Sequence, residues 1–308
     1  MIPSFGVKLP GLIPGYAPTL ADLPDLVVEF ERLGFDDVMD GEHILFAPVM
    51  HHPGGSGNMA HGRDRQHSDR GDSLLIFAAC AARTTRIRFV SGVLLAAAHN
   101  FAILARQAAT LDQLSRGRFT LGVGAGWFAG EFEAMGIPPE ERGRRLEEIL
   151  RACRALWAPG PASFTGEGIN FTEVLVEPAP YTNGGPPVWW AGDATRAVTA
   201  RRVVTLGEGW IAREAADIDE IAASARNLHR VAAEHGRDPA SIGMRVSLSA
   251  TADWNAAGSF DELVAAGADR VRRLSALGVT HFNVPLNYYR LDLDALGEFL
   301  KVLREATA

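Results

Sequence analysis

The side chains best suited to acid–base chemistry lie at the end of the second predicted strand, in the sequence Asp40-Gly41-Glu42-His43. Histidine changes its charge near neutral pH, which suits proton transfer. His43 also precedes a long loop, residues 46–71, rich in Gly, His, Asp and Arg. A lone histidine is often structural, but this position makes His43 the catalytic candidate. His99 after the third strand is a weaker candidate, which we expect in the substrate pocket.

A glycine-rich strand end, Gly122, Gly124 and Gly126, first suggests a phosphate-binding loop. The G-x-G-x-x-G fingerprint of dinucleotide sites fails in either register, because Trp127 and Ala129 stand where the third glycine is needed. We therefore expect these glycines to allow close packing against neighbouring strands or a planar ligand. Trp127 is a candidate for the substrate pocket.

A second candidate anion site is the segment Gly192-Asp193-Ala194-Thr195, which follows a buried strand and begins a predicted helix over 193–206. Free backbone N–H groups at a helix start attract phosphate. The alternative is a simple helix cap by Asp193.

Metal binding is not predicted. The loop histidines and acids have no spacing known for zinc ligands, namely His51, His52, His61, His67, Asp64 and Asp69. The two cysteines, Cys80 and Cys153, lie in apolar helical patterns and read as buried thiols.

The elements that position these residues alternate regularly between strand and helix. Eight strands are predicted, at 4–9, 35–39, 87–95, 118–121, 188–191, 209–211, 244–250 and 281–285. Each is followed by helical sequence, which predicts an α/β (β/α)₈ barrel, with a doubly wound sheet as the alternative. In a barrel the active site lies at the carboxyl ends of the strands, which adds Asn287 to the pocket candidates.

One domain over residues 1–308 is predicted, with an excursion at 158–186 that includes a small hairpin. The net charge of −7 disfavours a nucleic-acid surface. No apolar run approaches the ~20 residues of a membrane span and no signal peptide is recognisable, so a cytoplasmic enzyme acting on a small molecule is expected.

Several strings together resemble the luciferase-like monooxygenase superfamily, in particular its deazaflavin (F420)-dependent oxidoreductases. They are LGFDDVMDGEH at 33–43, LDQLSRGRFTLGVGAGW at 111–127 with the following EFEAMG, RGRRLEEI and ALW, PPVWWAGDATRAV at 186–198, and GEGW at 207–210. The resemblance extends from the first strand to about Trp210.

The resemblance implies a flavin or F420 ring across the barrel mouth, with its phosphate near Gly192, Asp193, Ala194 and Thr195. Gly92-Val93 matches a strand bulge that often holds a non-prolyl cis peptide behind the ring, and His43 matches an active-site histidine, with Glu42 beside it. The implied reaction is hydride transfer with F420. The alternatives are monooxygenation with reduced FMN from a separate reductase, a non-catalytic flavin-binding homologue on the same fold, and a metal-dependent barrel hydrolase. Family members are commonly homodimers.

This sequence departs from the family's pattern in two places. Trp127 stands where the sugar-phosphate dehydrogenases of the family have a glutamate, so that substrate class is not expected. The loop 46–71 is longer than expected, and we interpret it as a lid that excludes water from the site.

Overall fold

Eight parallel strands close into a barrel in the computed structural model, which describes residues 3–9, 19–46, 49–51, 58–60, 71–214, 216–248, 259–285 and 292–307. The barrel strands are β1 Ser4–Lys8, β2 Asp37–Asp40, β5 Arg88–Ser91, β6 Phe119–Val123, β9 Val188–Ala191, β10 Gly209–Ile211, β11 Gly243–Ser247 and β12 His281–Pro285. Spatial order follows chain order, and β1 closes the ring against β12. The predicted (β/α)₈ barrel is confirmed.

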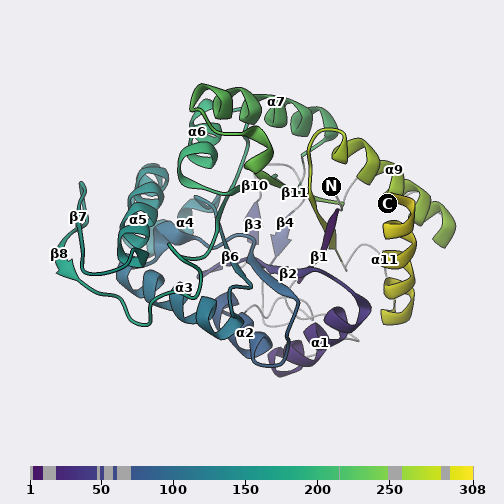
Figure 1. The fold of residues 1–308 in the computed structure, drawn as a ribbon, viewed down its shortest axis with the longest axis horizontal. Coiled ribbons are helices and arrows are strands. Elements are labelled where there is room, and N and C mark those ends of the chain that lie inside the picture. Colours follow the sequence, from purple (N-terminus) through teal and green to yellow (C-terminus); the bar gives the residue numbers. More distant parts are fainter. Residues whose placement is uncertain are drawn as a thin grey trace.

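Helices surround the strands on the outside of the barrel (Figure 1). They are α1 Leu23–Leu33, α2 Ser73–Ala81, α3 Phe101–Ser115, α4 Ala129–Ala134, α5 Arg142–Trp157, α6 Ala197–Leu206, α7 Ile218–Glu234, α9 Phe260–Ser275 and α11 Leu293–Thr307. Among the described residues, none of these helices is long and apolar enough to cross a bilayer.

Strand alternation divides the core into an outer and an inner part. Phe5, Val38 and Phe89 face outward into the main cluster between strands and helices. A separate cluster of Met39, Val90, Trp189 and Ile211 fills the inside of the barrel, with Val93 and Ala191 packed against it. The inner cluster forms the floor below the barrel mouth.

The two adjacent tryptophans of β9 point to opposite sides. Trp189 lies inside the barrel, where Gly209 and Gly243 make room for it: a Cβ at either glycine would lie within 2.5 Å of the indole. Trp190 faces outward, and the Arg202 guanidinium of α6 lies 5.9 Å from the centre of its ring. Both tryptophans are buried.

Two excursions leave the regular alternation. The predicted hairpin is present as β7 Ala162–Thr165 and β8 Asn170–Val174, which project beyond the ring of helices (Figure 1). The described parts of the long loop include an antiparallel pair, β3 Val49–His51 and β4 Asn58–Ala60. The remainder of that loop, with the histidine side chains considered for zinc, lies outside the described residues, as does Asn287.

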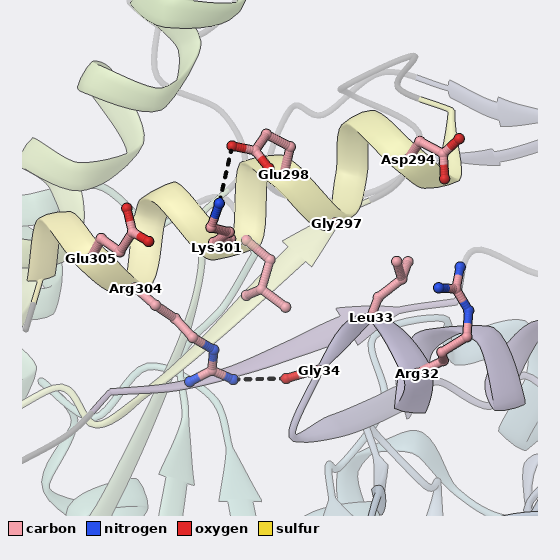
Figure 2. Close-up of a pocket in the computed structure, with 10 residues that line it drawn as sticks. Arg32, Leu33, Gly34, Asp294, Gly297, Glu298, Lys301, Arg304 and Glu305 are labelled. Atoms are coloured by element: carbon pink, nitrogen blue, oxygen red, sulfur yellow. Dashed lines mark hydrogen bonds and ion pairs between the residues drawn. The ribbon is translucent and has the colours of Figure 1, made fainter.

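An outer groove of about 560 Å³ lies between the end of α1 and one side of α11 (Figure 2). Both signs of charge line it, from Arg32, Lys301 and Arg304 and from Asp294 and Glu298. Arg304 donates to the carbonyl oxygen of Gly34 across one end of it. None of the residues predicted for catalysis or cofactor binding lines this groove.

Candidate active site

The third barrel strand, β5, ends earlier than predicted because the chain bends at a bulge. The peptide bond between Gly92 and Val93 is cis, as the family resemblance implied. The Gly92 N–H donates to the Asp40 carbonyl oxygen at 2.6 Å, and the Val93 carbonyl oxygen accepts from the Glu42 N–H at 3.0 Å. The bulge is thus tied to the end of β2, next to His43.

Three glycines at the ends of β2 and β6, the two strands that flank β5, allow this bulge to fit. A Cβ on Gly41 would lie 2.8 Å from the Gly92 carbonyl oxygen, and one on Gly124 would lie 2.6 Å from a methyl group of Val93. At Gly122 it would lie 1.9 Å from the Ser91 carbonyl oxygen. These glycines therefore pack closely against the end of β5 and its bulge, as expected from the sequence.

Glu42 and His99 form a pair directly behind the bulge. One Glu42 carboxylate oxygen accepts from the Leu95 N–H at 2.8 Å, and His99 Nε2 lies 3.0 Å from the same oxygen. Burial disfavours the charged imidazole of His99, but the hydrogen bond and charge of Glu42, with the charge of Asp72, outweigh burial and raise its pKa above 6.5. The pair therefore ties the chain after the bulge, at Leu95 and His99, to the end of β2.

His43 forms a second pair, with Glu131 of α4. Nδ1 of His43 lies 2.9 Å from Oε2 of Glu131, whose side chain is fully buried. Rings enclose the imidazole: the Trp127 ring centre lies 5.5 Å away at 81°, and the Phe46 ring centre lies 5.5 Å away. The structure thus brings His43 and Trp127 together, as expected of a catalytic residue and a pocket residue.

Glu131 was not identified from the sequence. It lies in the first turn of α4, where an acidic residue is ordinary because it favours the positive end of the helix dipole. Its other oxygen accepts from the backbone N–H groups of Ile44 and Leu45. Burial raises the pKa of its carboxyl group, but the hydrogen bonds from His43, Leu45 and Ile44 and the charge of His43 outweigh it and hold the pKa below 4.5.

The segment Gly192–Thr195, which was predicted to bind phosphate at the start of a helix, lies before the helix instead. The helix begins at Ala197 rather than at Asp193, and its N-cap is Arg196, which makes no capping hydrogen bond with its side chain. The Asp193 carboxylate instead accepts from the N–H and the hydroxyl of Thr195, closing a turn of Asx type before the helix. Asp193 is therefore not the helix cap, and its carboxylate already occupies the donors of Thr195.

The remaining residues of this segment are held by their neighbours. The Gly192 carbonyl oxygen accepts from the Trp210 indole at 2.8 Å, and Ala194 is fully buried. Gly192 directly follows Ala191, which packs on the same inner cluster as Val93. The open N–H groups nearest this point belong to the first turn of α6, beyond Arg196.

Comparison with known proteins finds an FMNH(2)-dependent monooxygenase among the relatives of this chain. The chain is 31% identical over 179 residues to an FMNH(2)-dependent dimethylsulfone monooxygenase from Pseudomonas putida, an alignment covering 57% of this chain and 47% of that protein. The chain thus spans about half the length of that relative.

Two solved structures share the fold over nearly their whole length. The monooxygenase RslO1 from Streptomyces bottropensis superposes with a TM-score of 0.75 at 21% identity, covering 98% of each chain. An F420-dependent secondary alcohol dehydrogenase, solved with an F420–acetone adduct, gives 0.72 at 17% identity, covering 98% of this chain and 99% of that one. At these identities the likeness establishes the fold alone.

The family description luciferase-like monooxygenase matches residues 4–274 of this sequence. That range includes seven of the eight barrel strands and every contact described around the bulge and His43. The chain therefore belongs to the luciferase-like monooxygenase family.

Proposed function

We propose that this protein is an F420-dependent oxidoreductase that transfers hydride between the deazaflavin and a small organic substrate. The observation that carries the proposal is the gathering of His43 and the backbone bulge at Gly92-Val93 on adjacent strand ends, joined by the Glu42–Val93 hydrogen bond. A bulge of backbone offers a flat surface for a planar ring, and a histidine beside it supplies the proton that must accompany a hydride.

The residues around the barrel mouth suit both the ring and the phosphate of such a cofactor. Small or apolar groups, Val93 and Ala191 on the inner cluster, provide the surface for a ring. The uncapped first turn of α6, with the basic Arg196 at its start, provides a place for phosphate. The N–H and the hydroxyl of Thr195 already donate to the Asp193 carboxylate. We therefore assign the phosphate contact to the backbone around Arg196 rather than to the segment of Asp193.

The bound cofactor would supply or accept the hydride, and the protein would do the rest. His43 exchanges a proton with the substrate, while Trp127 beside it limits the shape of substrates that reach the ring. Glu42 and His99 hold the bulge in place. In this assignment Glu42 and His99 support the cofactor surface and do not take part in proton transfer.

A second candidate function is monooxygenation with reduced FMN, supplied by a separate reductase. The relative from Pseudomonas putida favours it, because that protein is FMNH(2)-dependent and 31% identical to this chain where they align. Oxygen chemistry requires that water be excluded. The loop 46–71 would serve as the lid in either reaction, and we further propose a cytoplasmic homodimer.

Binding titrations with F420, FMN and riboflavin separate the two functions. We expect quenching of protein fluorescence by F420 at concentrations at least ~10-fold lower than by FMN, a difference of about 1.4 kcal/mol. Riboflavin lacks phosphate and should bind more weakly than FMN if an anion seat exists. Tight FMN binding with no effect of F420 would overturn the F420 assignment in favour of the monooxygenase.

The variant His43→Ala tests whether the site is catalytic at all. With the preferred cofactor, turnover should fall ~100-fold or more while cofactor binding is kept. His235→Ala, at the exposed end of α7, is the matched control and should retain full activity. Unchanged turnover in His43→Ala would exclude His43 as the catalytic residue, whereas a wild-type protein that binds the cofactor without any turnover would support the non-catalytic flavin-binding alternative.

A further inference from the structure

The buried carboxylate of Glu131 contacts three groups, all on the short segment His43–Leu45. One oxygen accepts from two backbone N–H groups, those of Ile44 and Leu45 at the root of the long loop. The other lies 2.9 Å from His43 Nδ1. The side chain is fully buried, so water does not compete for these positions. An ionised carboxylate is an acceptor only, which determines where the proton of the neighbouring imidazole must be.

We propose that Glu131 is a positioning residue that fixes the tautomer of His43, holding a proton on Nδ1 and leaving Nε2 as the nitrogen that exchanges protons with the substrate. The contact with an acceptor-only oxygen requires that Nδ1 be the donor. In the neutral ring, Nε2 then carries the lone pair. The expected effect on turnover rests on the proposed function, whereas the tautomer of His43 does not.

The same contacts support both protonation states that proton exchange requires. When Nε2 takes a proton from the substrate oxygen, the ring becomes a cation beside a buried carboxylate that neutralises it. When Nε2 gives the proton back, the Nδ1–H bond to Glu131 is retained. One proton moves between Nε2 and the substrate oxygen, and no electron is transferred in this step.

Replacing Glu131 by glutamine should reverse the tautomer. The two backbone donors, Ile44 and Leu45, require an acceptor, so the amide oxygen of the new side chain takes their place. The amide NH₂ then faces Nδ1 of His43 and donates to it, which moves the ring proton to Nε2. Because glutamine has the size of glutamate, the packing of α4 is preserved and the reversal is a change in hydrogen bonding alone.

The test is ¹⁵N NMR of the histidine rings in the full-length protein without any cofactor, at a pH where the rings are neutral. The His43 signals are identified by their loss in His43→Gln. In the wild type we expect protonated Nδ1 and bare Nε2, and in Glu131→Gln the opposite pattern. Glu133→Gln, an exposed glutamate two residues away on α4, should match the wild type. A wild-type ring protonated on Nε2 would overturn the proposal, even if Glu131→Gln failed to fold.

Turnover provides the second measurement. Glu131→Gln should lower kcat by ~100-fold or more with KM little changed, because the wrong tautomer cannot accept a proton at Nε2. In a His43→Ala background the same substitution should have no further effect, since Glu131 acts through His43. Equal losses in both backgrounds would show a merely structural role. If His43→Ala loses no activity while the tautomer is as expected, the proposed function fails and the positioning of His43 stands.

Discussion

Inside the barrel, Asp37 of β2 and Arg245 of β11 form an ion pair that should dominate the effect of mutations in the inner core. The two guanidinium nitrogens donate to the two carboxylate oxygens at 2.9 and 2.7 Å, and both side chains are 2% exposed. Asn283 accepts a further hydrogen bond from Arg245. A Cβ on Gly6 would lie 2.0 Å from the carboxylate, so a glycine on β1 makes room for the pair.

The substitution Asp37→Ala leaves the guanidinium buried without its counter-ion. Breaking a buried ion pair from one side costs ~3–5 kcal/mol, because the remaining charge keeps its desolvation penalty. At ~2–4 °C per kcal/mol for a chain of this size class, Tm should fall by roughly 6–20 °C. Asp25→Ala removes the exposed pair with Arg83 and should change the free energy of unfolding by less than ~1 kcal/mol.

Urea unfolding followed by tryptophan fluorescence is the assay, since the Arg245 guanidinium lies 5.7 Å from the Trp189 ring centre. The double variant Asp37→Leu with Arg245→Met should recover most of the loss, because two apolar groups of similar volume leave no charge behind. A loss below ~1 kcal/mol in Asp37→Ala, or a double variant no better than the single one, would refute the reasoning.

Two further predictions concern the mouth of the barrel. Gly124→Ala places a methyl group against Val93, which should displace the bulge and weaken cofactor binding ~10-fold or more in the fluorescence titration. The control is Gly143→Ala, whose methyl group meets only the end of a flexible arginine side chain and should leave binding unchanged. Glu42→Gln removes the charge that raises the pKa of His99, so the stability difference from wild type should be largest below pH 6.5 and should shrink as the pH rises through the raised pKa. A pH-independent difference in urea midpoint would contradict the second prediction.

The barrel could be predicted because its signals are local. A strand such as Val188–Ala191 is a short apolar run bounded by Pro187 and Gly192, and strand and helix alternate with a regularity that few architectures share. The predicted strand boundaries were wrong where tertiary contacts determine them. The third strand stops at Ser91 rather than at Leu95, because the bulge turns the chain toward Glu42 and Gly122.

The candidate site was only partly predictable because its key contacts join distant residues. Glu131 is 88 positions from His43, and Arg245 is 208 positions from Asp37. No periodicity relates such pairs. The turn at Asp193, by contrast, is local, and the sequence Asp-Ala-Thr is compatible with a side chain that bonds to the backbone two residues on. The helix prediction outweighed that signal and placed the start of the helix four residues too early.

The two acid–histidine pairs at the mouth each join one glutamate to one histidine, but they differ in the histidine nitrogen that makes the contact. His99 directs Nε2 to Glu42, a carboxylate that also anchors the Leu95 N–H, so this pair joins two parts of the scaffold. His43 directs Nδ1 to Glu131, so the nitrogen that points away from this contact is Nε2, at the tip of the side chain. The sequence ranked His43 above His99 by position alone. Under the proposed function the hydrogen bonds agree with that order, because a ring bound through Nδ1 extends its second nitrogen away from its own backbone.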